Sequence, residues 1–162
     1  MDAASKPPQP ARVCFTSPWV DVVAVPSGNG SAEEHLVVRA HDYVSIVAVL
    51  PDGRVLLVRQ YRPAVNGETL ELPAGHVERD QTPEDAARQE LLEETGYRAG
   101  GVQPLGVLHP DTGRMGNRHF VFFASDLEKV AEPLEHEGTV PLAVTPAELV
   151  AMMLDEIGRA HV

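Results

Sequence analysis

The chain has 162 residues and a mass of 17.5 kDa, which is the size of one domain. Its 13 Lys and Arg against 24 Asp and Glu give a formal net charge of −11. This balance argues against nucleic acid as a partner and against a basic helix on a membrane surface, because both depend on clustered Lys and Arg. An acidic protein that acts on a phosphate substrate needs cations to mediate the contact.

The single cysteine, Cys14, excludes an intrachain disulfide and fits a reducing compartment. The longest nearly apolar stretch, residues 43–50, is too short to span a bilayer. Residues 1–10 lack the apolar run of a secretory signal. We therefore expect a cytoplasmic protein with no membrane partner.

The first half of the chain is predicted to be β-rich. Residues 1–11 carry three prolines and predict a disordered tail. Alternating or β-branched apolar patterns, bounded by Gly, Pro and Asn turns, predict five strands, at 19–25, 35–40, 43–50, 54–59 and 68–72.

The spacing of apolar residues changes from that of strands to that of a helix at Thr82, which is suited to cap a helix that begins at Pro83. The apolar pattern runs to residue 95, and Gly96 is suited to end the helix. The second half continues with predicted strands at 102–108, 119–125 and 140–144, a loop at 109–118, an acidic loop at 131–138, and a final helix at 146–157. Two helices among strands in mixed order predict an α+β fold.

The helix at 83–95 carries an unusual acidic face. Glu90, Glu93 and Glu94 are spaced i, i+3 and i+4, so they lie on one side of the helix, where like charges repel. One interpretation is a solvated acidic surface. The other is a site for a hard divalent cation such as Mg²⁺ or Mn²⁺, which prefers oxygen ligands.

The surrounding sequence resembles the Nudix box, G-x5-E-x7-R-E-U-x-E-E-x-G-U, in which U is a bulky apolar residue. The matching residues are Gly75, Glu90, Leu91, Glu93, Glu94, Gly96 and Tyr97. Gln81 stands where the box has Glu, and Gln89 stands where it has Arg. The resemblance implies that the family's charged residues at these two positions form an ion pair that braces the loop against the helix. A neutral Gln–Gln hydrogen bond is the replacement expected here.

The resemblance implies a Nudix fold, with a mixed sheet between helices (α/β/α), over residues 43–162. Residues 12–42 would form a small N-terminal β extension. In this family such segments often exchange between subunits, so we expect a homodimer.

The flanking motifs, Arg59-Gln60-Tyr61-Arg62-Pro63 and Glu71-Leu72-Pro73-Ala74-Gly75, resemble the branch that hydrolyses ADP-ribose and other nucleoside diphosphate sugars. ADP-ribose would yield AMP and ribose 5-phosphate. A Thr at position 112, where a turn in ADP-ribose hydrolases commonly carries Pro, leaves GDP-mannose or a broad substrate range as alternatives. A nucleotide-sugar-binding module without turnover is another, since Gln81 and Gln89 depart from the box.

The resemblance also implies the metal ligands. The carbonyl of Ala74 would hold the cations together with Glu90 and Glu94. Glu93 would be a shared or outer ligand and a catalytic residue. The alternative to a Gln–Gln brace is a partial loss of catalytic power, because the usual Arg at position 89 of the box can also orient a ligand carboxylate.

The substrate contacts are implied in the same way. Arg59 and Arg62 would bind the diphosphate or the terminal sugar, unless they simply end an edge strand. Glu71 would pair with one of these arginines or with substrate. Arg114, on the loop at 109–118, is a further candidate for phosphate, against the simpler interpretation of a surface residue.

The general base is expected on the acidic loop. Glu135 matches the loop glutamate that part of the branch uses as a base, and Glu137 is its rival. The alternative is that both are solvated charges on an acidic surface.

Overall fold

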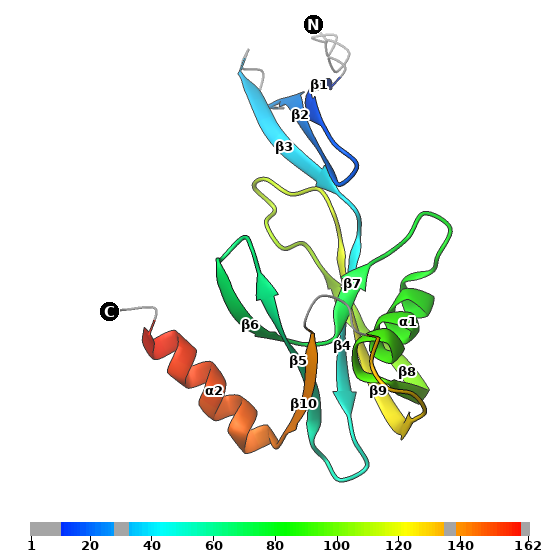
Figure 1. Ribbon diagram of the computed structural model, residues 1–162. Helices are drawn as coiled ribbons and strands as arrows, with labels where there is room; N and C mark the ends of the chain where they lie inside the picture. Colours follow the sequence, from blue (N-terminus) through cyan, green and yellow to red (C-terminus); the bar gives the residue numbers. More distant parts are fainter. Residues whose placement is uncertain (1–10, 28–32, 135–138, 160–162) are drawn as a thin grey trace, which may run out of the picture.

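The structure is a computed structural model that describes residues 11–27, 33–134 and 139–159. The predicted tail lies outside these residues except for Ala11. In these residues ten strands form a small N-terminal sheet and a larger sheet, and two helices accompany the larger one (Figure 1).

The strands and helices have the following bounds. The strands are β1 (Arg12–Thr16), β2 (Val20–Pro26), β3 (Glu34–Ala40), β4 (Tyr43–Val49), β5 (Val55–Arg62), β6 (Gly67–Glu71), β7 (Ala74–His76), β8 (Tyr97–Leu108), β9 (His119–Lys129) and β10 (Val140–Val144). The helices are α1 (Pro83–Thr95) and α2 (Pro146–Arg159). The sequence did not predict β1 or β7, and β8 begins at Tyr97 rather than at residue 102.

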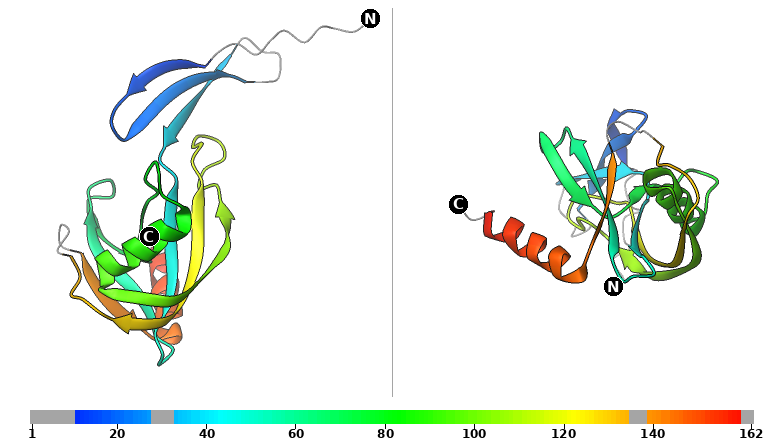
Figure 2. Two further views of the ribbon diagram at one scale, coloured as in Figure 1. Left: turned by 90° about the vertical axis from the view of Figure 1, so that its right-hand side faces the viewer. Right: turned by 60° about the horizontal axis from the view of Figure 1, so that its bottom comes forward.

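The N-terminal sheet has the antiparallel order β1-β2-β3 and projects from the rest of the chain (Figure 2). Its only fully buried apolar side chains in the described residues are Val23 and Ala24. Val13, Phe15 and Trp19 are exposed, and Trp19 keeps 70% of its surface accessible. This sheet therefore has an apolar surface that its own chain leaves uncovered.

The larger sheet has the order β10-β5-β4-β9-β8, in which β4 and β9 are parallel and the other neighbours are antiparallel. Strand β4 pairs with β5 only over Ala48–Val49, whereas β7 pairs with β4 over Tyr43–Ser45. The N–H of Ile46, between these two segments, donates to the carbonyl of Pro73 at 2.9 Å. The β5–β6 hairpin thus separates from β7 at one end of the sheet.

The two faces of this sheet carry different cores, because successive side chains of a strand point in opposite directions. On one face Ile46 and Leu56 pack with Leu91 of α1. On the other, Val55 and Leu57 pack with Leu149 of α2. The helices lie on opposite sides of a mixed sheet (Figure 2), so the predicted α+β fold with α/β/α layers is confirmed.

Local chemistry sets the bounds of α1. The hydroxyl of Thr82 accepts a hydrogen bond from the N–H of Asp85 at 3.1 Å, and Pro83 occupies the first turn. Gly96 ends the helix with φ 73°, a left-handed conformation that costs glycine little, and its N–H donates to the carbonyl of Leu92. The predicted bounds of 83–95 match the structure.

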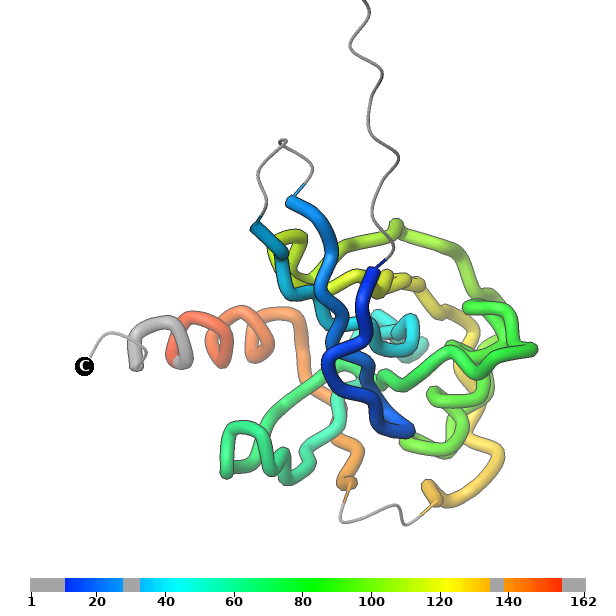
Figure 3. The backbone as a smooth tube through the Cα atoms, turned by 90° about the horizontal axis from the view of Figure 1, so that it is seen from above, coloured from blue at the N-terminus to red at the C-terminus, as the bar shows by residue number. Residues whose placement is uncertain are grey.

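Helix α2 is less enclosed. It extends away from the sheet (Figure 3) and leaves Val150, Met153 and Leu154 exposed. No helix in the part of the chain that the structure describes is long and apolar enough to cross a membrane.

The loop at 109–118 links the two sheets. The N–H of Val38 on β3 donates to the carbonyl of Arg114 at 2.7 Å, and Gly116 returns a bond to the carbonyl of Val38 at 3.0 Å. The guanidinium of Arg118 donates to Asp42 from Nε at 3.0 Å and from Nη2 at 2.6 Å. Burial by itself would raise the pKa of Asp42, but the hydrogen bonds and charge of Arg118 together outweigh it and lower this pKa.

Candidate functional site

A cavity of about 330 Å³ lies between the β5–β6 side of the sheet and the acidic face of α1. It is close to the point where β5 separates from β7. Its lining combines carboxylates with one arginine and comprises Gln60, Tyr61, Arg62, Pro63, Glu90, Glu93, Glu94 and Thr139. The three glutamates that the sequence singled out therefore meet Arg62 at one cavity.

Glu94 is a partly buried carboxylate of this cavity with a strongly shifted pKa. Burial raises its pKa to about 7, and the nearby charge of Glu90 acts in the same direction. The N–H of Ala74 opposes this shift by donating to Oε2 of Glu94 at 2.9 Å. This bond brings the Ala74 peptide to the acidic face of α1.

Gly75 allows this close approach. A side chain at this position would overlap the Glu90 carboxylate, since an added Cβ would fall on its Cδ and oxygen atoms. The first glycine of the box is thus required by contact with Glu90 rather than by a left-handed backbone. The loop backbone thus lies directly against the carboxylates of Glu90 and Glu94, and the two elements form a cradle lined by carboxylate oxygens.

Glu93 is held by two neighbours. Its Oε1 accepts a hydrogen bond from Nε2 of Gln89 at 2.9 Å, and its backbone carbonyl accepts one from the N–H of Leu134 at 2.8 Å. Gln81 donates to Gln89 at 2.8 Å, so the neutral Gln–Gln bond expected from the sequence is present. The two replaced positions remain in contact without a formal charge.

Arg62 and Glu71 form a bidentate pair. Nε of Arg62 donates to Oε1 of Glu71 at 2.9 Å, and Nη2 donates to Oε2 at 2.7 Å. The hydrogen bonds from Arg62 lower the pKa of Glu71. Burial has the opposite effect, and a hydrogen bond from Thr69 lowers the pKa further. Glu71 therefore stays ionised and fixes the Arg62 guanidinium at the edge of the cavity.

The other two arginines lie elsewhere. Arg59 is exposed and lies outside the lining of the cavity. Arg114 lies on the loop that bonds to Val38 of the N-terminal sheet. Within this one chain, neither meets the carboxylates of α1.

Tyr43 is a neighbour of the site that the sequence did not reveal. Its ring lies between those of His76 and His119, with centroid distances of 5.5 and 5.4 Å in edge-on geometry. Burial raises the pKa of Tyr43, while the charge of Arg62 lowers it. The available signal was a tyrosine that begins an otherwise apolar strand facing this site.

The oxygen donors suit a hard cation. Within residues 11–27, 33–134 and 139–159, no three His, Cys, Asp or Glu side chains converge closely enough to enclose a metal ion. Mg²⁺, however, is usually held by one or two carboxylates, by waters and by substrate phosphates. The cradle formed by the Ala74–Gly75 backbone and Glu90 fits that mode of binding.

The predicted bases, Glu135 and Glu137, lie outside the described residues. The residues on either side of this segment are at the site: Leu134 is bonded to Glu93, and Thr139 lines the cavity. The described residues that flank positions 135–138 thus lie beside Glu93 and at the cavity.

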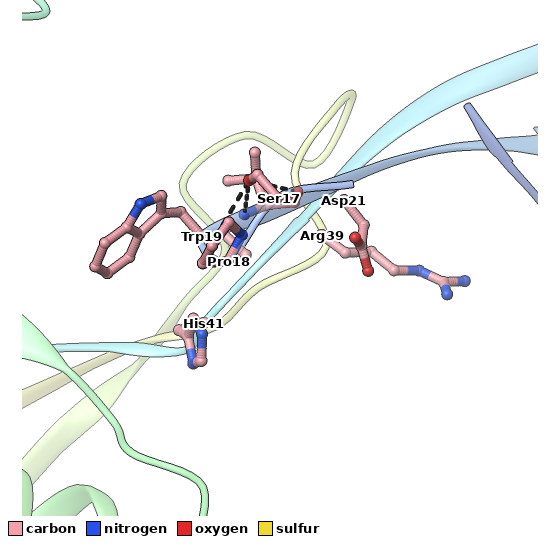
Figure 4. Close-up of a pocket in the computed structure, with 8 residues that line it drawn as sticks. Ser17, Pro18, Trp19, Asp21, Arg39 and His41 are labelled. Carbon is pink, nitrogen blue, oxygen red and sulfur yellow. Dashed lines mark hydrogen bonds between the residues drawn. The ribbon is translucent and has the colours of Figure 1, made fainter. Parts of the chain in front are cut away.

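A second hollow, of about 230 Å³, lies on the N-terminal sheet (Figure 4). Trp19, Asp21, Arg39 and His41 are among its lining residues. The hydroxyl of Ser17 accepts hydrogen bonds from the N–H groups of Trp19 at 3.2 Å and Val20 at 3.0 Å, which orders the turn that presents the indole.

The fold is a mixed sheet between two helices, and the acidic face of α1 meets the Arg62–Glu71 pair at its cavity. This arrangement defines a class of protein suited to bind a cation and a phosphate together. The family comparison agrees, because the NUDIX domain model matches residues 39–161. The chain belongs to the Nudix family.

Three relatives illustrate the similarity. The ADP-ribose pyrophosphatase of Bacillus subtilis (strain 168) is 32% identical over 117 residues, which cover 72% of this chain and 62% of the relative. The GDP-mannose pyrophosphatase of Pectobacterium atrosepticum is 34% identical over 113 residues, covering 64% of this chain and 58% of the relative. The crystal structure of an ADP compounds hydrolase superposes with a TM-score of 0.72 at 19% identity and covers 92% of this chain and 85% of that one.

The matched segment spans less than two thirds of the length of either curated relative. The similarity to the solved structure, at 19% identity, supports the fold.

Proposed function

We propose that this protein is a divalent-cation-dependent pyrophosphatase of nucleoside diphosphate sugars, with ADP-ribose as the first substrate and AMP and ribose 5-phosphate as products. The observation that carries the proposal is the cavity at which Glu90, Glu93 and Glu94 face the Arg62–Glu71 pair. Carboxylates alone would repel a diphosphate. An arginine fixed beside a cation site can bind one.

The proposed residues have separate tasks. The Ala74 carbonyl and the three glutamates hold Mg²⁺ or Mn²⁺, with Glu93 as a shared or outer ligand. A cation bound there supplies neutralisation of the diphosphate charge and polarisation of phosphorus. Arg62 donates hydrogen bonds to phosphate oxygens.

A general base on the acidic loop takes a proton from the attacking water in this proposal. Glu135 is the first candidate and Glu137 the second. We expect Glu135→Gln to lower kcat by roughly 10²–10⁴-fold, as for other general bases, and Glu137→Gln to change it by less than about tenfold. The two variants conserve volume and remove the same charge, so steady-state kinetics at saturating Mg²⁺ compares them directly. The reverse ranking would assign the base to Glu137.

A homodimer belongs to the same proposal. The exposed Val13, Phe15 and Trp19 on the N-terminal sheet give a second copy an apolar surface to cover. The indole of Trp19, which lines the hollow on this sheet, is also suited to stack on a nucleobase. Sedimentation equilibrium of the full chain should give twice the monomer mass, whereas a monomer at micromolar concentration would contradict the dimer.

The substrate is best tested with a panel of ADP-ribose, GDP-mannose, NADH, diadenosine polyphosphates and deoxynucleoside triphosphates, each with Mg²⁺ and with Mn²⁺. We expect AMP release from ADP-ribose to have the highest kcat/KM, with none after chelation. Greater turnover of GDP-mannose would favour the second substrate, consistent with the Pectobacterium relative. Faster cleavage of free triphosphates would contradict the proposal.

A binding module without turnover is the second candidate, because Gln81 and Gln89 replace the charged residues of the box. Tight calorimetric binding of ADP-ribose with no product would support it. We also place the protein in the cytoplasm, on the basis of its single and exposed cysteine, Cys14.

A further inference from the structure

A one-way series of hydrogen bonds runs from a loop to a carboxylate of the site. The N–H of Glu78 donates to Oε1 of Gln81 at 3.2 Å, Nε2 of Gln81 donates to Oε1 of Gln89 at 2.8 Å, and Nε2 of Gln89 donates to Oε1 of Glu93 at 2.9 Å. Two neutral side chains thus connect the loop backbone to Glu93. We call this series the amide relay.

The direction of the amide relay is fixed at both ends. An ionised Glu93 can only accept, so Gln89 must turn its NH₂ group toward it and its carbonyl toward Gln81. Gln81 must then donate to Gln89, which leaves its own carbonyl to accept from the backbone N–H of Glu78. Each amide has one orientation that satisfies both neighbours, so the amide relay restricts where the Glu93 carboxylate points.

The amide relay also gives the Glu93 carboxylate a donor without a charge. The Nudix pattern has Arg at position 89, which would set a full positive charge one helical turn from Glu93. Here the donor is a neutral amide. The arginine that lines the cavity, Arg62, is already bound to Glu71 in a bidentate pair. The carboxylate face of α1 therefore keeps more negative potential than the family pattern would give it.

We propose that Gln81 and Gln89 are positioning residues that orient Glu93 for a divalent cation and, by remaining neutral, strengthen cation binding to this chain relative to the charged pair of the family pattern. This inference rests on the proposed function, because it assigns the cation to the same cavity. A pair that only braced the loop onto α1 would affect stability without affecting cation affinity.

The test measures Mn²⁺ binding to the full-length chain without substrate, by calorimetry or by electron paramagnetic resonance of free Mn²⁺. Gln89→Arg should weaken binding by roughly 10–100-fold, the range seen when the partner of a metal ligand is altered. The double variant Gln81→Glu/Gln89→Arg restores an ion pair that partly neutralises the guanidinium, so its affinity should fall between those of Gln89→Arg and the wild type.

Two controls separate position from charge. Gln89→Met removes the donor without adding charge and should weaken Mn²⁺ binding severalfold, but less than Gln89→Arg. Gln103→Arg makes the same charge change at an exposed position of β8, outside the cavity lining, and should leave Mn²⁺ affinity within about twofold. Thermal unfolding in chelator shows whether each variant remains folded.

The outcomes distinguish this inference from the proposed function. If the wild type binds Mn²⁺ and hydrolyses substrate but Gln89→Arg and Gln89→Met bind equally well, the inference is overturned and the proposed function stands. A double variant that binds more tightly than the wild type also overturns it. If the wild type binds no Mn²⁺, the cation site of the proposed function fails, and the inference fails with it.

Discussion

Helices α1 and α2 begin with the same chemistry but differ in their surroundings. Each has a threonine cap followed by proline: the hydroxyl of Thr82 accepts from the N–H of Asp85, and that of Thr145 accepts from the N–H of Glu148. Helix α1 is the more polar of the two yet buries Leu91 to 1% exposure, whereas Leu154, on the more apolar α2, keeps 64% exposure. A cap determines where a helix starts, while the rest of the chain determines what covers it.

The acidic faces of the helices differ as well. On α1 three glutamates face a cavity, and burial raises the pKa of Glu94. On α2 the first-turn glutamate, Glu148, accepts the N–H of its own cap residue, and this backbone bond lowers its pKa. Helix α1 thus buries a carboxylate beside another acidic side chain, and we propose that a cation offsets this cost. Four predictions test this contrast.

The largest expected effect is on activity. Glu94→Gln removes an ionisable ligand while keeping the shape of the side chain, so we expect kcat/KM for ADP-ribose to fall by roughly 10²–10³-fold, as when one charge-stabilising group is lost. Glu84→Gln is the matched control, since Glu84 is on the same helix but pairs with Arg88 in solvent. It should stay within about threefold of the wild type. Equal losses in both variants would contradict the assignment of Glu94.

The next effect is on stability. Leu91→Ala empties a fully buried position in the core and should lower the free energy of unfolding by about 2–5 kcal/mol. Leu154→Ala makes the same change on exposed α2 and should alter it by less than about 0.5 kcal/mol. Urea unfolding at low protein concentration compares the two. A large loss in Leu154→Ala would show that α2 is covered in solution.

A smaller effect should appear with pH in the metal-free protein. The folded-state pKa of Glu94, about 7, is above that of the unfolded chain, so the contribution of this group is complete at acidic pH and is lost as the pH rises through 7. With solvent screening allowed for, the loss is about 1–2 kcal/mol by pH 8. Glu94→Gln should therefore be more stable than the wild type at pH 8 and similar at pH 5, in chelator. A constant difference between the two pH values would contradict the buried charge.

The smallest effects concern the caps. Thr82→Ala should destabilise the fold by about 1 kcal/mol, because α1 is part of the core. Thr145→Ala removes the same bond from α2 but should barely move the global transition and should instead increase amide exchange along α2. Hydrogen exchange of both variants checks this. An equal shift of the melting temperature would show that α2 unfolds together with the sheet.

The sequence predicted the elements that are set by local chemistry. The bounds of α1 follow from Thr82, Pro83 and Gly96, each of which acts within one turn of the helix. The contact of Gln81 with Gln89 could also be predicted, because the resemblance to the Nudix box implies that these two positions pair.

Elements set by distant partners were missed. Strand β7 has three residues and follows Pro73, so it reads as a loop, and its pairing with β4 is what makes it a strand. The start of β8 contains Gly100 and Gly101, which suggest a turn, yet the register with β9 extends the strand back to Tyr97. Pairing across the sheet overrode local propensity in both cases.

The sequence does not distinguish the two arginines of β5. It predicts substrate contacts for both Arg59 and Arg62, whereas in this one chain Arg62 lines the cavity and Arg59 does not. The location of Tyr43 beside the site could not be predicted either. Its position depends on His76 and His119, which come from two other strands.

The parallel pairing of β4 with β9 has a consequence for folding during synthesis. Tyr43 is matched with His119, and the whole carboxylate helix lies in the intervening segment. The sheet cannot close around α1 until β9 has left the ribosome, and closing so long a loop is slow. A helix of this length is only marginally stable by itself. The three glutamates can therefore be held at the cavity only after β9 has been synthesised and has paired with β4.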